Sequence, residues 1–339
     1  TGVRRADTFG YSAIQADTGA FGPWTKEFIF GNKTSEDCLY LNIWTAAKRA
    51  NAKLPVLVYI HGGGFSGGSG EVAVYDGTKL AIKGLVVVTI NYRLGALGFF
   101  AHPELTKESG HNSSGNYGLL DQVAALRWIQ KNIAAFGGNP NNVTIAGQSA
   151  GAASVHYLTA SPLAKGLFHR AIAQSGSGVG RGFTRPREVA EQEGIRYAQE
   201  KKVTSLSALR ALPAKSFIGY FSDPFRFGPA IDGWFLTDDV TKIFAEHKQN
   251  DVPTLTGLTA DEGSAFPNKM SAEAFRKQAQ QRYGEHAEAF LSLYPANSDA
   301  EVATSQRVAE RDQGVYSMAL WAEQRANTAK TKSYLYYFA

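Results

Sequence analysis

The chain has 339 residues, 44% of them hydrophobic, which is enough for a large buried core. The net charge of +5 is small for this length and no block of Lys and Arg occurs, so neither nucleic acid nor a membrane surface is an expected partner. The single cysteine, Cys38, excludes an internal disulfide and a zinc site built from cysteines, and no apolar run is long enough to span a bilayer.

Three stretches of the N-terminal third predict strands, after a loop-like segment over residues 1–31. Residues 38–44 alternate apolar and polar side chains, as a half-buried strand does. Residues 54–60 and 85–90 are continuous apolar runs, which are typical of central strands covered on both faces.

A helix and three more strands are expected further along the chain. Residues 116–136 repeat apolar side chains at spacings of three and four, which predicts a helix. Gly, Asn and Pro residues over 137–142 end it and lead into a short apolar strand. Strands are also expected at 170–174 and 252–258. This alternation predicts an α/β fold with a mostly parallel sheet and helices on both faces.

Two long segments interrupt the alternation and set the expected domain organisation. Residues 178–250 and 264–332 are helical in character and longer than a normal crossover, so we interpret them as insertions above the sheet of one domain, residues 1–339. The chain starts without Met and stops after an apolar run at 334–338 that resembles a buried strand. We therefore expect an incomplete domain that lacks N- and C-terminal parts.

Residues 147–151, Gly-Gln-Ser-Ala-Gly, have the form of a nucleophile elbow, in which a serine stands on a sharp turn between a strand and a helix. The neighbouring chain passes close to such a turn, so the residues two before and two after Ser149 must be small. The alternative is an ordinary glycine-rich turn with an incidental serine. The pattern makes Ser149 the candidate nucleophile.

A second glycine-rich turn, His-Gly-Gly-Gly-Phe at 61–65, follows the strand at 54–60. Because Gly63 and Gly64 have no side chains, their N–H groups can face a substrate and stabilise an oxyanion. The N–H of Ala150, the residue after the nucleophile, is a further candidate donor. A phosphate-binding loop is the alternative, but no Gly-Lys-Ser or Gly-Lys-Thr follows. Phe65 adjoins these glycines and is a candidate for the substrate pocket.

The acid and the base of a catalytic triad are harder to assign. Glu262 follows the strand at 252–258 and could orient a histidine, although Asp261 beside it is a rival. In this motif class the histidine follows the acid in the chain. The only later histidine, His286, lies in a segment typical of a surface helix. No histidine of this chain is therefore assigned as the base.

Seven stretches, in order along the chain, resemble the type B carboxylesterase family, which includes bacterial carboxylesterases, lipases and cholinesterases. The resemblance implies the α/β-hydrolase fold and ester hydrolysis through an acyl-serine, with no cofactor and no metal. The matching stretches are SEDCLYLNIW (35–44), HGGGF (61–65), NYRLGALGFF (91–100), NYGLLDQ (116–122), FGGNPNNVTIAGQSAGA (136–152), FGPAIDG (227–233) and GLTADEG (257–263).

Carried over by position, the resemblance implies roles for five residues and one departure. Ser149 would be the nucleophile and Glu262 the triad acid, and the family's histidine would fall beyond residue 339. The oxyanion donors would be the N–H groups of Gly63, Gly64 and Ala150. Many members pair the cysteine that matches Cys38 with an upstream cysteine, but this chain has Ala13 there, which implies a free, buried thiol.

The leading hypothesis is a serine carboxylesterase that acts on uncharged carboxylic esters, with a small-molecule ester as its substrate. The alternatives are a catalytically silent binding protein of the cholinesterase-like group and a lipase of the same family. Trp24, Phe227 and Trp234 are further aromatic candidates for the pocket, each more often found in a core. Acyl and alcohol preference, oligomeric state and localisation stay open.

Overall fold

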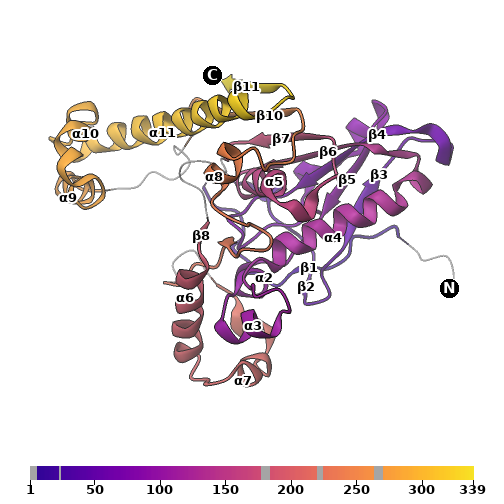
Figure 1. Ribbon diagram of the computed structural model, residues 1–339, viewed down its shortest axis with the longest axis horizontal. Helices are drawn as coiled ribbons and strands as arrows, with labels where there is room; N and C mark the ends of the chain where they lie inside the picture. Colours follow the sequence, from indigo (N-terminus) through magenta and orange to yellow (C-terminus); the bar gives the residue numbers. More distant parts are fainter. Residues whose placement is uncertain (1–5, 23, 177–183, 220–223, 263–269) are drawn as a thin grey trace.

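A sheet with the strand order β11-β10-β7-β6-β4-β5-β3 forms the centre of the computed structural model, which describes residues 6–22, 24–176, 184–219, 224–262 and 270–339 (Figure 1). Only β3 is antiparallel to its neighbour, β5; the other pairs are parallel. This arrangement confirms the mostly parallel sheet predicted from the sequence. The strands are β3 (Leu41–Trp44), β4 (Leu54–Ile60), β5 (Val86–Ile90), β6 (Gly138–Gln148), β7 (Arg170–Gln174), β10 (Thr254–Thr259) and β11 (Ser333–Phe338).

Short elements and helices complete the described part of the chain. Two small parallel pairs lie outside the central sheet: β1 (Ser12–Ala13) with β2 (Thr34–Ser35), and β8 (Arg185–Pro186) with β9 (Ala230–Ile231). The α-helices are α1 (Thr78–Ile82), α2 (Gly95–Phe99), α3 (Pro103–Glu108), α4 (Tyr117–Asn132), α5 (Ala150–Ala160), α6 (Arg187–Glu200), α7 (Leu206–Arg210), α8 (Val240–Ala245), α9 (Ala272–Tyr283), α10 (Ala287–Leu293) and α11 (Asp299–Thr328). The 3-10 helices are η1 (Lys26–Phe28), η2 (Ala50–Ala52), η3 (Ala73–Tyr75), η4 (Ile133–Phe136), η5 (Pro162–Ala164), η6 (Ala214–Phe217) and η7 (Gly284–His286).

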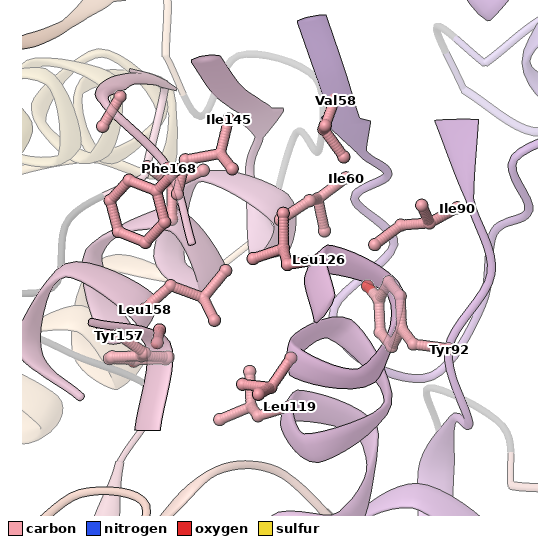
Figure 2. Close-up of a cluster of buried hydrophobic side chains, with 14 of the residues drawn as sticks. Val58, Ile60, Ile90, Tyr92, Leu119, Leu126, Ile145, Tyr157, Leu158 and Phe168 are labelled. Atoms are coloured by element: carbon pink, nitrogen blue, oxygen red, sulfur yellow. The ribbon is translucent and has the colours of Figure 1, made fainter. Parts of the chain in front are cut away.

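The core lies between the central strands and helices α4 and α5. Along β4, Val58 and Ile60 are fully buried on one face, where they meet Ile145 of β6 and Leu126 of α4 (Figure 2). Burying each aliphatic side chain of this kind contributes about 1.5–3 kcal/mol. Tyr59, on the opposite face of β4, is only half-buried. This packing holds the central strands in place, and the candidate site lies at the ends of these strands.

Both long segments that the sequence marks as insertions are helical where the structure describes them. Residues 184–219 and 224–250 contain α6, α7 and α8, and residues 270–332 contain α9, α10 and α11. Helix α11 lies along β10 and β11, and α9 and α10 lie at its far end, away from the sheet (Figure 1). None of the described helices is long and apolar enough to cross a membrane.

The structure also places Cys38 and the apolar run at 334–338. Cys38 is free and almost fully buried, as the resemblance implies, and burial raises the pKa of its thiol to about 11. The run at 334–338 does form a strand, β11, but it lies at the edge of the sheet. Its side chains Tyr334, Leu335, Tyr337 and Phe338 are exposed, so this edge of the sheet has no outer neighbour in the described part of residues 1–339. The apolar run thus forms the predicted strand.

Candidate active site

Ser149 stands at the turn between β6 and α5 with a strained backbone. Its φ of 56° and ψ of −121° are unfavourable for any residue other than glycine and cost on the order of 1–3 kcal/mol. The turn is held on both sides, because the N–H of Ser149 donates to the carbonyl of Gln174 (2.9 Å) and its carbonyl accepts from the N–H of Ala153 (2.9 Å). The serine is thus fixed at the C-terminal edge of the sheet.

The two glycines that flank Ser149 meet the requirement for small residues. A Cβ on Gly147 would lie 2.5 Å from the carbonyl carbon of Gly151 and 2.9 Å from the carbonyl oxygen of Ile60. A Cβ on Gly151 would overlap that same oxygen. Both positions therefore admit only glycine while β4, β6 and α5 stay where they are.

The glycine turn after β4 lies directly against this serine. A Cβ on Gly62 would lie 2.7 Å from the carbonyl oxygen of Gln148 and 3.2 Å from the Cβ of Ser149. Gly63 and Gly64 have φ values of +105° and +61°, which glycine adopts without strain. Within the described ranges, the N–H groups of Gly63, Gly64 and Ala150 have no acceptor. Three unpaired donors beside Ser149 suit the stabilisation of a negatively charged oxygen.

A cavity of about 660 Å³ connects Ser149 and the glycine turn with the face of β4 and β5 that bears Tyr59 and Val87. Its lining is mostly apolar, and Asp76 is the one charged side chain among the described residues that line it. A site of this composition favours uncharged organic ligands. The aromatic side chains of the lining are Phe21, Trp24, Phe28, Phe30, Tyr59 and Tyr75.

The aromatic candidates from the sequence lie in different places. Phe65 differs from its expectation: its backbone has a φ of +60°, and its side chain turns into the core and packs edge-on against Phe99 (5.1 Å between ring centroids). Trp24 lines the cavity instead. Phe227 belongs to a separate aromatic cluster, and Trp234 stacks on His111 in another cavity.

Apart from Trp24, sequence reasoning missed the part of the cavity wall that lies before β2 and at Tyr75; these residues are Gln15, Ala16, Thr18, Phe21, Phe28, Ile29, Phe30 and Tyr75. These residues lie in loops and 3-10 helices without a regular hydrophobic period, so no local pattern could indicate that they face Ser149.

Glu262 lies in the turn after β10, at the same edge of the sheet as Ser149. One carboxylate oxygen accepts from the backbone N–H (3.0 Å) and the hydroxyl (3.2 Å) of Thr259. Burial, and secondarily the negative charge of Glu262, raises the pKa of Tyr336. Two strand spacings separate β10 from β6, or about 10 Å, which leaves room for an imidazole ring. The rival Asp261 is exposed.

Two of the seven histidines are buried, and neither lines the cavity. The Nδ1 of His61 lies 2.8 Å from the carbonyl oxygen of Gly62, and its ring stacks on Tyr92 behind the glycine turn. His156 packs against Trp321 of α11. Burial lowers the pKa of both rings to about 4, because it disfavours the charged form.

The other five histidines lie outside the cavity as well. His169, for example, accepts from the N–H of Val143, six extended residues and thus about 20 Å before Ser149. His102 caps a helix, and His111 stacks on a tryptophan. His247 contacts a backbone carbonyl, and His286 is exposed. No histidine of residues 1–339 therefore faces Ser149 across the cavity.

Comparison with known proteins gives consistent results. A model of the carboxylesterase family matches residues 1–338. The fumonisin B1 esterase of Sphingopyxis macrogoltabida is 44% identical over 280 residues, which is 79% of this chain and 51% of that protein. The para-nitrobenzyl esterase of Bacillus subtilis is 39% identical over 286 residues, 80% of this chain and 57% of that protein. This chain thus spans about half the length of these curated relatives.

A solved structure extends the match to the fold. The carboxylesterase of Geobacillus stearothermophilus, crystallised at pH 6.2, superimposes with a TM-score of 0.84 at 34% sequence identity. The match covers 99% of this chain and 70% of that one.

Proposed function

Because the chain belongs to the carboxylesterase family and has the α/β-hydrolase fold, we propose that it is the nucleophile-bearing part of a serine carboxylesterase. The observation that carries the proposal is the strained Ser149 at the end of an apolar cavity, beside three backbone N–H groups for which the described residues provide no acceptor. Strain of this kind persists only where the surrounding structure enforces it, and it concentrates at functional sites. A purely binding relative has no use for it.

In the proposed reaction, the Oγ of Ser149 attacks the ester carbonyl carbon and transfers its proton to a histidine. The carbonyl π electrons move to the oxygen, which accepts hydrogen bonds from the N–H groups of Gly63, Gly64 and Ala150. Collapse of this intermediate breaks the bond to the alkoxy oxygen, which takes the proton from the histidine and leaves as the alcohol. Water then hydrolyses the acyl-serine through the same steps.

Glu262 is the proposed triad acid, and the general base is proposed to lie outside residues 1–339. A carboxylate that follows β10, two strand spacings from the strand that bears Ser149, could orient an imidazole placed between them. The positions of the seven histidines support this, since none of them lines the cavity.

The substrate class follows from the composition of the cavity. The cavity has a volume of about 660 Å³, and its described lining is mostly apolar with one carboxylate. This composition supports uncharged carboxylic esters of moderate size as substrates. The names of two relatives, a para-nitrobenzyl esterase and a fumonisin B1 esterase, agree with ester substrates in general.

The test uses p-nitrophenyl acetate and p-nitrophenyl butyrate with the complete gene product that contains these 339 residues. We expect a burst of p-nitrophenol equal in amount to the enzyme, followed by turnover, and no burst in Ser149→Ala. Residues 1–339 alone should show essentially no turnover, because loss of the general base in a comparable triad costs on the order of 10⁶ in kcat. A burst that persists in Ser149→Ala would refute the nucleophile, and robust turnover by residues 1–339 would mean that one of their own histidines is the base.

A further inference from the structure

The side chain of Gln15 makes a paired contact with the backbone of Gly68, which is 53 residues away in the sequence. Its Nε2 donates to the carbonyl oxygen of Gly68 (2.9 Å), and its Oε1 accepts from the N–H of Gly68 (2.7 Å). A third bond from Nε2 to the carbonyl of Ala13 (3.1 Å) fixes the amide. Gln15 is only 6% exposed and Gly68 is half-buried, so these bonds are partly shielded from competing water.

Gly68 in turn packs on the glycine turn that carries the proposed oxyanion donors. A Cβ on Gly68 would overlap the Nδ1 of His61 and lie 2.6 Å from the carbonyl oxygen of Gly62. The next residue back, Gly67, donates its N–H to the carbonyl of Gly63 (3.0 Å). A displacement of Gly68 is therefore transmitted to Gly63 through direct contacts.

The opposite side of the same turn is already anchored. The hydroxyl of Tyr92 donates to the carbonyl of His61 (2.9 Å), and the two rings stack with centroids 4.3 Å apart. Tyr92 is fully buried in the main core. The glycine turn is thus anchored at its start by the contacts of His61. Its return segment, the backbone at Gly68 that leads away from the turn, is held by Gln15.

We propose that Gln15 is a positioning residue for ester hydrolysis: it holds the return segment of the glycine turn and so keeps the N–H groups of Gly63 and Gly64 aimed at the reacting oxygen. This inference rests on the proposed esterase function. Glycine-rich backbone has unusual conformational freedom, so a turn with five glycines among residues 62–68 needs an external holder to keep one geometry. Gln15 also lines the cavity, so a direct contact with substrate is the competing role.

The test compares Gln15→Met with a matched control, Gln130→Met, in the complete gene product. Gln130 lies on α4, outside the cavity lining, and its Nε2 also bridges two backbone carbonyls, those of Pro140 (2.8 Å) and Leu167 (2.9 Å). Both variants lose an amide that links distant segments, but only one of these amides contacts the glycine turn. Active-site titration with a fluorophosphonate gives kcat per competent site and removes any effect of partial misfolding.

For Gln15→Met we expect kcat to fall roughly 10- to 100-fold with KM nearly unchanged, since a misplacement of about 1 Å can cost about 10² in rate. The Ki of an alkyl trifluoromethyl ketone, whose serine adduct carries an oxyanion, should rise by the same factor. Amide hydrogen exchange should become faster over residues 61–68. Gln130→Met should change the melting temperature only.

Unchanged kcat and Ki in Gln15→Met would overturn the inference, and a rise in KM alone would replace it with direct substrate contact. If Gln15→Met does not fold, Gln15→Glu keeps an acceptor for the N–H of Gly68 but loses the donor, and the same criteria apply. A wild-type protein without ester hydrolysis overturns the proposed function. The exchange over residues 61–68 then decides separately whether Gln15 holds the turn.

Discussion

Replacement of Gly63 by alanine should remove most of the esterase activity while the protein still folds. Gly63 has a φ of +105°, and an added Cβ would overlap the carbonyl oxygen of Gly67 and lie 2.7 Å from its carbonyl carbon. Because both contacts are with backbone, the peptide of Gly63 must move. Its N–H can then no longer point at the reacting oxygen.

The expected loss is that of one oxyanion donor. Such a loss lowers kcat by about 10²–10³, which corresponds to about 2.7–4 kcal/mol of transition-state stabilisation. A side chain at positive φ also costs about 1–2 kcal/mol of folding free energy wherever it occurs. The catalytic effect must therefore be separated from this conformational cost.

Gly84→Ala provides the control for that cost. Gly84 has a similar φ of +92°, lies in the turn before β5 at the end of the sheet remote from Ser149, and has no atom within 4 Å of an added Cβ. The assay measures kcat per titrated active site on p-nitrophenyl butyrate, and the melting temperature, for both variants. Gly63→Ala with kcat near that of Gly84→Ala would refute the assignment of the oxyanion turn.

Three further predictions concern single residues. Tyr92→Phe removes the bond to His61 and leaves a buried carbonyl unpaired, so the free energy of unfolding should fall by about 1–3 kcal/mol in urea titrations and kcat should fall too; unchanged values of both would contradict this. Ser149→Gly should abolish hydrolysis yet raise the free energy of unfolding by about 1 kcal/mol, because glycine relieves the strained backbone; a less stable variant would contradict this. His156 has a folded pKa of about 4, below its unfolded value, so its contribution to stability is complete above about pH 6.5 and is lost as the pH falls toward 4. Between pH 7 and pH 4.5, the free energy of unfolding of His156→Leu should therefore fall by about 2 kcal/mol less than that of the wild type. Parallel plots of the free energy of unfolding against pH for the two proteins would refute this.

The sequence predicted the parts of the structure that depend on local pattern. The run at 54–60 became β4, and residues 116–136 became α4 and η4, because a buried strand and an amphipathic helix each impose their own period. The glycines around Ser149 could be recognised because the tight turn leaves no space for a Cβ.

The rest depends on contacts between distant segments, which local pattern does not encode. Phe65 adjoins the glycine turn in sequence, but a positive φ directs its ring into the core. Gln15 lies in a loop, and nothing in its neighbourhood indicates that it bonds Gly68.

Mapping the covalent adduct of a fluorophosphonate on the complete gene product tests the nucleophile most directly. We predict one adduct, on the peptide that contains Ser149, with loss of ester hydrolysis in proportion to the label and no label on folded Ser149→Ala. An adduct on another residue that abolishes activity, or full hydrolysis after Ser149 is blocked, would contradict the assignment.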